Sequence, residues 1–344
     1  MPDAPRHEPL AHVLRAGLVE SVHHGSMIVL DPAGEVLFAA GEPDAVHHPR
    51  STLKPVQAIA MVRLGLTLPA DLLALAAGSH SGEERHVEGA RELLSLHDLS
   101  PEDLRNPPEL PMDPEVRRAH LAAGRGREKL AHNCSGKHAA MVATARLRGW
   151  STVDYERAEH PVQQAIAATV AELSGETPAH VAVDGCGAPA FALTLRGLAR
   201  AIGVIAAGRE GTAAAAVAAA MRAHPEMVGG TGRGVTALLR AVPGVVTKDG
   251  AEGVQVAALA NGCAVAVKVG DGAARPQTQL IAAGLLLCGV ASEHLAVLLD
   301  GALGDRPDGV RLTAPLRGAV EQAGELRTVP AGAMLQPVRS GGVG

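Results

Sequence analysis

The chain has almost no aromatic side chains. Its 344 residues include two phenylalanines, one tyrosine and one tryptophan, namely Phe38, Phe191, Tyr155 and Trp150. Proteins that bind single-stranded nucleic acid stack its bases on aromatic side chains, and proteins that bind a phosphate backbone carry positive charge. So few aromatics and a formal net charge of -5 therefore argue against a nucleic-acid partner. A hydrophobic fraction of 47% is enough for a large core, which must consist of closely packed aliphatic side chains.

Cysteines and long apolar stretches are also scarce. The four cysteines, Cys134, Cys186, Cys263 and Cys288, are too few and too scattered for a disulfide framework. The longest apolar stretch, residues 280–291, is shorter than the roughly 20 residues that a membrane-spanning helix needs. Residues 1–10 are polar and lack the basic-then-apolar pattern of a secretory signal. We therefore expect a cytoplasmic protein with reduced thiols and no membrane partner.

The remaining patterns predict a mixed fold with strands near both ends. Residues 27–31 and 35–39 flank an Asp-Pro-Ala-Gly turn, and residues 254–259 and 263–269 flank an Asn-Gly turn, so each pair predicts a hairpin. Apolar spacings of three and four residues predict helices over residues 52–64, 87–96, 138–148, 161–173, 212–223, 235–241, 277–290 and 293–303. This order predicts an α/β (α+β) fold, in which an antiparallel sheet of N- and C-terminal strands packs with helices beside a helical lobe.

No shift in composition divides the chain into separate domains. Residues 101–114 form a proline-rich loop at most, and no sequence period repeats. We predict a single domain with two lobes over residues 1–344, in which residues 1–10 and 336–344 are flexible.

Lysine is scarce as well. The chain has 31 basic side chains, and only five are lysines, namely Lys54, Lys129, Lys137, Lys248 and Lys268. Lysine, unlike arginine, can lose its proton in a protein and then act as a base or a metal ligand. Three of the five, Lys54, Lys137 and Lys248, lie in compact polar motifs, which are therefore candidates for catalytic chemistry.

The first of these motifs is Ser-x-x-Lys, with Ser51 three residues before Lys54. A serine hydroxyl is a poor nucleophile until a base accepts its proton, and a neutral lysine amine can be that base. Residues three apart share one face of a helix, which would bring the two side chains together. Pro55 makes the first turn irregular, because proline disfavours the helical conformation of the residue before it. Taken alone, the motif is more often a serine helix cap followed by a solvated lysine.

Three other segments have the composition of site loops. Ser79 and His80 follow an apolar stretch in Gly-Ser-His-Ser-Gly-Glu, where a helix cap is the alternative. Lys248 lies in Thr-Lys-Asp-Gly just before the C-terminal hairpin. A Lys-x-Gly at a sheet edge is the third sequence element of serine β-lactamases and penicillin-binding proteins, and an ordinary turn is the alternative. Residues 229–234, Gly-Gly-Thr-Gly-Arg-Gly, lack the ending of a P-loop, so they predict a flexible loop or a wall close to the substrate.

Five motifs together resemble the L-asparaginase II family, the rhizobial-type asparaginases. In chain order they are Arg-Ser-x-x-Lys-Pro from Arg50, Ser-His-Ser from Ser79, Asn-Cys-Ser-Gly-Lys-His from Asn133, Asp-Gly-Cys from Asp184 and His-Pro-Glu-Met-Val from His224. The resemblance covers about residues 17–269, and the motifs are too numerous to coincide by chance. It implies a fold similar to that of serine β-lactamases and glutaminases, a homodimer, and hydrolysis of L-asparagine to L-aspartate and ammonia.

The resemblance also implies roles for individual residues. It implies two serine–lysine pairs, Ser51 with Lys54 and Ser79 with Lys248. Asp184 matches an aspartate of the family's substrate pocket. Arg50, His80 and His138 lie in the other matching motifs. Together with Asp184 they are the candidate substrate-binding residues.

A zinc site of Cys134, Lys137 and Cys186 is a further implication of the resemblance. Thiolates bind zinc readily, whereas a neutral lysine amine is an uncommon ligand. From the residue types alone, the two cysteines could equally be buried small hydrophobic residues or form a redox-labile disulfide. Because the serines already provide the nucleophile, we expect a single zinc ion to modulate activity rather than to be essential, and we expect no organic cofactor.

The chemistry that we expect is covalent catalysis. Ser51 would attack the side-chain carboxamide while a neutral Lys54 accepts its proton, and water would then hydrolyse the acyl-enzyme. Asp184 would bind the α-ammonium group of the substrate, unless it is a turn residue. The sequence leaves open which serine attacks and whether asparagine or glutamine is preferred. The alternatives are a glutaminase or another β-lactamase-like serine hydrolase, and a non-catalytic protein that binds zinc through its thiols.

Overall fold

An antiparallel sheet built from both ends of the chain organises the fold. The computed structural model describes residues 4–300, 302–303 and 306–323. The sheet has the strand order β10-β1-β2-β9-β8-β7, with β3 paired to β2. Its strands are β1 (Glu8–Arg15), β2 (Leu18–Leu30), β3 (Val36–Ala40), β7 (Val246–Gly250), β8 (Val254–Ala258), β9 (Ala264–Val269) and β10 (Gly309–Leu312). This sheet confirms the predicted fold class, a mixed α/β protein with an antiparallel sheet of N- and C-terminal strands.

Both predicted hairpins are confirmed. Strand β2 pairs with β3 from Met27 opposite Ala40, and β8 pairs with β9 from Val254 opposite Lys268. Gly262 of the Asn-Gly turn has a φ of 95°, which glycine adopts without strain. The predicted flexible N-terminal segment is too long, because β1 begins at Glu8. The first three residues and the predicted flexible segment 336–344 lie outside the described residues.

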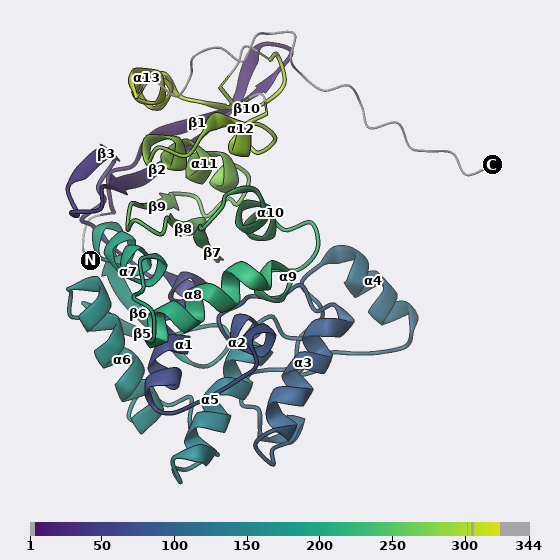
Figure 1. Ribbon diagram of the computed structural model, residues 1–344. Coiled ribbons are helices and arrows are strands. Elements are labelled where there is room, and N and C mark those ends of the chain that lie inside the picture. Colours follow the sequence, from purple (N-terminus) through teal and green to yellow (C-terminus); the bar gives the residue numbers. More distant parts are fainter. Residues whose placement is uncertain (1–3, 301, 304–305, 324–344) are drawn as a thin grey trace.

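Helices cover both faces of the sheet (Figure 1). Helix α7 (Leu195–Ala206) packs on one face, where a Cβ at Gly203 would lie 2.8 Å from the carbonyl oxygen of Gly262. Helix α11 (Gln277–Leu287) packs on the other, where a Cβ at Gly284 would lie 2.6 Å from the side chain of Val265. Such close approaches let small residues fill a core that has few aromatics.

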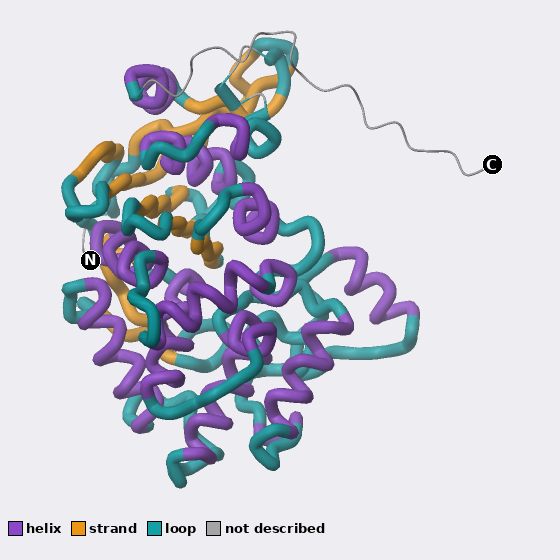
Figure 2. Tube along the Cα trace, viewed as in Figure 1, coloured by secondary structure: helices purple, strands orange, loops and turns teal. Residues whose placement is uncertain are grey.

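The middle of the chain forms a helical lobe below the sheet in this view (Figure 2). Its helices are α1 (Lys54–Arg63), α2 (Ala70–Ala76), α3 (Glu84–Ser95), α4 (Pro114–Ala122), α5 (Ser135–Leu147), α6 (Pro161–Ser174), α8 (Ala213–Ala223) and α9 (Pro225–Val228), and α10 (Gly234–Ala241) lies beside the sheet (Figure 1). A second small sheet, in the order β4-β6-β5, joins this lobe. Its strands are β4 (Val46–His47), β5 (His180–Val183) and β6 (Pro189–Thr194).

One predicted helix is wrong. Instead of a helix over 293–303, the described residues form the short α12 (Ser292–Leu295), followed by turns and by α13 (Ala314–Gln322). The apolar residues of this segment are nevertheless buried, namely Leu295, Leu299 and Ala302. Their spacing therefore indicates burial rather than a continuous helix. Among the described residues, no helix is long and apolar enough to cross a membrane.

Candidate active site

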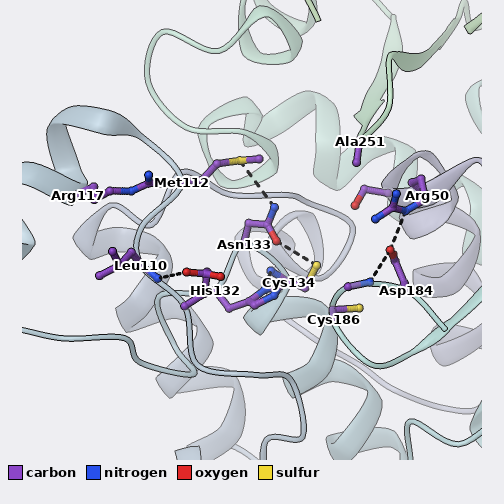
Figure 3. A pocket seen from close by; sticks show the side chains of 13 residues that line it. Arg50, Leu110, Met112, Arg117, His132, Asn133, Cys134, Asp184, Cys186 and Ala251 are labelled. Carbon is purple, nitrogen blue, oxygen red and sulfur yellow. Dashed lines mark hydrogen bonds and ion pairs between the residues drawn. The ribbon is translucent and has the colours of Figure 1, made fainter. Parts of the chain in front are cut away.

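Ser51 borders a polar cavity. It lies in a short 3₁₀ helix, Arg50–Leu53, directly before α1. Arg50 has a φ of 55°, a left-handed conformation that costs a non-glycine residue energy and often marks functional sites. The cavity has a volume of about 370 Å³. Its lining, most of which is labelled in Figure 3, is Arg50, Ser51, Glu109, Leu110, Met112, Arg117, His132, Asn133, Cys134, Asp184, Gly185, Cys186 and Ala251.

Lys54 is fully buried and hydrogen-bonds to Ser79 rather than to Ser51. Its Nζ lies 2.9 Å from Ser79 Oγ, 2.6 Å from the carbonyl oxygen of Gly78 and 3.2 Å from that of Asn133. Burial lowers the pKa of Lys54, which favours a neutral amine. A neutral amine has two N–H donors for the two carbonyls and one lone pair for the serine proton, so this arrangement suits a base for Ser79. The predicted pairing of Ser51 with Lys54 is therefore not the hydrogen bond that forms.

The position of Ser79 depends on helix α9. The backbone N–H of Ser79 donates to the carbonyl oxygen of Val228 at 2.8 Å. A Cβ at Gly78 would lie 2.7 Å from the carbonyl oxygen of Met227 and 2.8 Å from that of Val228. Only glycine at 78 allows this approach, so the His-Pro-Glu-Met-Val motif supports the serine loop.

Lys248 lies on β7, the edge strand next to the 3₁₀ helix. A Cβ at Gly250 would lie 2.9 Å from the carbonyl oxygen of Pro49, so the glycine lets the strand run close to Ser51. Lys248 Nζ is buried and donates to the backbone oxygen and to Oδ1 of Asp249, both at 2.6 Å. Among the described residues, these are its hydrogen bonds, and the predicted partner Ser79 is bonded to Lys54 instead. Burial lowers the pKa of Lys248 to about 8, although Asp249 acts in the opposite direction.

The predicted zinc ligands form a cluster. Cys134, the N-cap of α5, and Cys186, in the β5–β6 turn, are buried, and Lys137 Nζ lies 3.0 Å from Cys186 Sγ. Hydrogen bonding with Cys134 and the charge of Lys137 hold the pKa of Cys186 far below its usual range. The same hydrogen bond, together with burial, raises the pKa of Cys134. Burial alone would lower the pKa of Lys137, but the two sulfurs raise it.

This donor set fits zinc in part. Two sulfur donors suit the metal, but the third would be the amine of Lys137, which must first lose the proton that it shares with Cys186. Among the described residues, no group of three or more histidine, cysteine, aspartate or glutamate side chains has the arrangement of a metal site. Zinc at this cluster therefore stays a prediction.

Asp184 and Arg50 form an ion pair at the wall of the cavity. Arg50 Nε donates to Asp184 Oδ1 at 2.7 Å, and the backbone N–H of Gly185 donates to the same oxygen at 2.8 Å (Figure 3). Asp184 is also a turn residue, which was the alternative prediction, because the backbone N–H of Gly187 donates to its backbone oxygen at 2.8 Å. Both side-chain contacts use Oδ1, and no hydrogen bond to Oδ2 accompanies them within the part of the chain that the structure describes.

The two predicted substrate-binding histidines lie behind the cavity wall. His80 has no exposed surface; its Nε2 lies 2.9 Å from Ser135 Oγ, and its Nδ1 accepts from the N–H of Gly82 at 3.2 Å. Both ring nitrogens are therefore in use. His138 is equally buried, with Nδ1 3.0 Å from the hydroxyl of Tyr155. Neither histidine lines the cavity in this arrangement.

Several cavity residues were not predicted as site residues. Asn133, whose side chain lies between Met112 and Cys134 in Figure 3, borders the cavity and accepts from Lys54 through its backbone. Its place in the Asn-Cys-Ser-Gly-Lys-His motif was a usable signal. Met112 lies in a loop outside the five motifs, and no pattern in the sequence around it indicates a site residue.

A buried lysine that hydrogen-bonds to a serine beside a polar cavity is typical of serine hydrolases that use lysine as the base. The chain belongs to the L-asparaginase II family, whose sequence profile matches residues 11–305. This membership supports an amidohydrolase. No curated protein sequence matches the chain significantly.

Solved structures give weak similarity. One is EstCE1, a hydrolase with promiscuous acyltransferase activity, at 14% identity and a TM-score of 0.39 over 72% of this chain and 88% of that one. A β-lactamase from Mycobacterium bovis gives 15% identity and a TM-score of 0.34 over the same shares. The native form of Mglu gives 17% identity and a TM-score of 0.34 over 80% of this chain and 66% of that one.

Proposed function

We propose that this protein hydrolyses L-asparagine to L-aspartate and ammonia through a serine acyl-enzyme. The observation that carries the proposal is the contact between Lys54 and Ser79, 2.9 Å apart, in a buried position next to the cavity that Ser51 borders. Family membership over residues 11–305 supports an amide substrate.

In this proposal Ser51 is the nucleophile. Ser51 borders the cavity, whereas Ser79 is only 3% exposed and is not among the cavity-lining residues. In this proposal the proton of Ser51 passes to Ser79, whose own proton passes to Lys54, when Ser51 attacks the side-chain carboxamide. The C–N bond then breaks, ammonia leaves with a proton from the lysine, and water hydrolyses the ester.

Arg50 and Asp184 would bind the amino-acid part of the substrate. The guanidinium can pair with the α-carboxylate, and Oδ2 of Asp184 can accept from the α-ammonium. These two contacts would hold the substrate in the cavity that Ser51 borders, so that the carboxamide can be positioned for attack.

A zinc ion, if bound, would be held by Cys134, Lys137 and Cys186. The metal would fix the positions of two cavity-lining sulfurs and so tune substrate affinity. We also propose a cytoplasmic homodimer as the working state.

Ammonia release from asparagine and from glutamine tests the proposal. We expect turnover of asparagine by the wild type and its loss in Ser51→Ala, with the exposed Ser95→Ala as a matched control that keeps full activity. Faster release from glutamine would favour the glutaminase alternative. Release from neither substrate would contradict the proposal and favour a protein that binds metal through its thiols.

A further inference from the structure

The glycine-rich loop at residues 229–234 is fixed against the serine loop. Ser81 Oγ donates to the carbonyl oxygen of Gly229 at 2.9 Å, and the backbone N–H of Thr231 donates to Glu83 Oε1 at 2.6 Å. Gly230 has a φ of 116°, and a Cβ there would lie 2.4 Å from Ser81 Oγ. Only glycine fits at this position, so the loop has a defined place relative to the site rather than the flexibility that its composition suggests.

Arg233, within this loop, is the N-cap of α10 and contacts two elements of the site. Its Nη2 donates to Asp249 Oδ2 at 2.5 Å, and its Nη1 lies 2.9 Å from Met112 Sδ. Met112 borders the cavity. The guanidinium therefore joins the rim of the cavity to the end of strand β7.

Asp249 is shared between two cations. Its Oδ1 accepts from Lys248 and its Oδ2 accepts from Arg233. We propose that Arg233 is a positioning residue, which acts on Lys248 by holding the carboxylate of Asp249 between them. This inference rests on the proposed function and adds to it that the protonation of Lys248, whose strand runs close to the 3₁₀ helix of Ser51, affects turnover.

The charges around Lys248 give the direction of the effect. Besides burial, the charged groups that act on it among the described residues are Asp249, Lys54 and Arg233. Asp249 favours the protonated form of Lys248, and the two cations disfavour it. Removing Arg233 would leave Asp249 with Lys248 as its single cationic partner and would remove one repelling charge. Both changes raise the pKa of Lys248.

The pH dependence of asparagine turnover tests this inference. If the neutral amine of Lys248 is needed, kcat/KM of the wild type rises with pH through about 8. In Arg233→Met this rise of kcat/KM should shift to a pH about one unit higher. Arg233→Lys should return it to the wild-type pH. Arg240→Met is the matched control, because Arg240 lies on the same helix but pairs with Glu226. If Arg233→Met lost the same fraction of activity at every pH and its kcat/KM still rose at the wild-type pH, the inference would be overturned.

A direct titration separates this inference from the proposed function. With five lysines in the chain, ¹³C NMR of the lysine side chains can follow each amine, and Lys248→Met assigns the signal. We expect the pKa of Lys248 to rise in Arg233→Met and to stay unchanged in Arg240→Met. An unchanged pKa in Arg233→Met overturns the role of Arg233 even if asparagine is hydrolysed. A raised pKa upholds the coupling even if asparagine is not the substrate.

Discussion

Gly78→Ala is the substitution that most sharply separates the geometry of the serine loop from its chemistry. The added Cβ would lie 2.7 Å and 2.8 Å from the carbonyl oxygens of Met227 and Val228. Both are backbone atoms, so relief requires that α9 or the serine loop move as a unit. The movement would also disturb the hydrogen bond from Ser79 N to Val228 O.

The expected loss of stability follows from these contacts. Overpacking costs about 1–3 kcal/mol, and the disturbed hydrogen bond adds about 0.5–1.5 kcal/mol. We therefore expect Gly78→Ala to lose roughly 2–4 kcal/mol of unfolding free energy, measured as a lower urea midpoint. Activity should fall as well in the folded variant, because Ser79 moves relative to Lys54.

Gly126→Ala is the matched control. A Cβ at Gly126 would meet nothing within 4 Å, and no positive φ constrains the residue. Its stability should stay within about 0.5 kcal/mol of the wild type. If Gly78→Ala were as stable and as active as Gly126→Ala, the close approach of α9 would not be what holds Ser79.

Two further predictions concern the substrate wall and the metal. Asp184→Asn should raise KM for asparagine by about tenfold or more with a smaller effect on kcat, because a hydrogen bond to a charged group contributes about 1.5–3 kcal/mol; a change confined to kcat would contradict binding of the α-ammonium. Protein treated with a chelator should lose zinc by elemental analysis and retain turnover with an altered KM; complete loss of turnover, restored by zinc, would show that the metal is essential.

The elements with strong local signals could be predicted from the sequence. The hairpin over 254–269 followed from its Asn-Gly turn, and the helix over 161–173 followed from its apolar spacing; in the structure α6 ends at Gly175, which has a φ of 71°. Strand β1 and strands β5 and β6 were missed, because β1 mixes polar and apolar residues, β5 has only four residues, and residues 189–193 of β6 are all apolar. None of them alternates cleanly.

The serine–lysine hydrogen bonds were harder to predict from the sequence, because they depend on how distant segments pack together. Spacing within a helix suggested Ser51 as the partner of Lys54, but a 3₁₀ turn precedes α1 and directs the lysine into the core. Its actual partner, Ser79, is placed by the approach of Gly78 to α9, some 150 residues further along the chain. Similarly, the hydrogen bond of Lys248 to its neighbour Asp249 depends on the burial of the lysine side chain on the edge strand β7. No periodic pattern in the sequence predicts that burial.

The central claim is that Ser51 forms an acyl-enzyme with the help of the Lys54–Ser79 pair. Rapid acid quenching during asparagine turnover, followed by peptide mass spectrometry, measures it directly. We predict an aspartyl adduct on the peptide that contains Ser51, which is absent in Ser51→Ala and reduced in Ser79→Ala. Normal turnover by Ser51→Ala, or an adduct on Ser79 alone, would contradict the account.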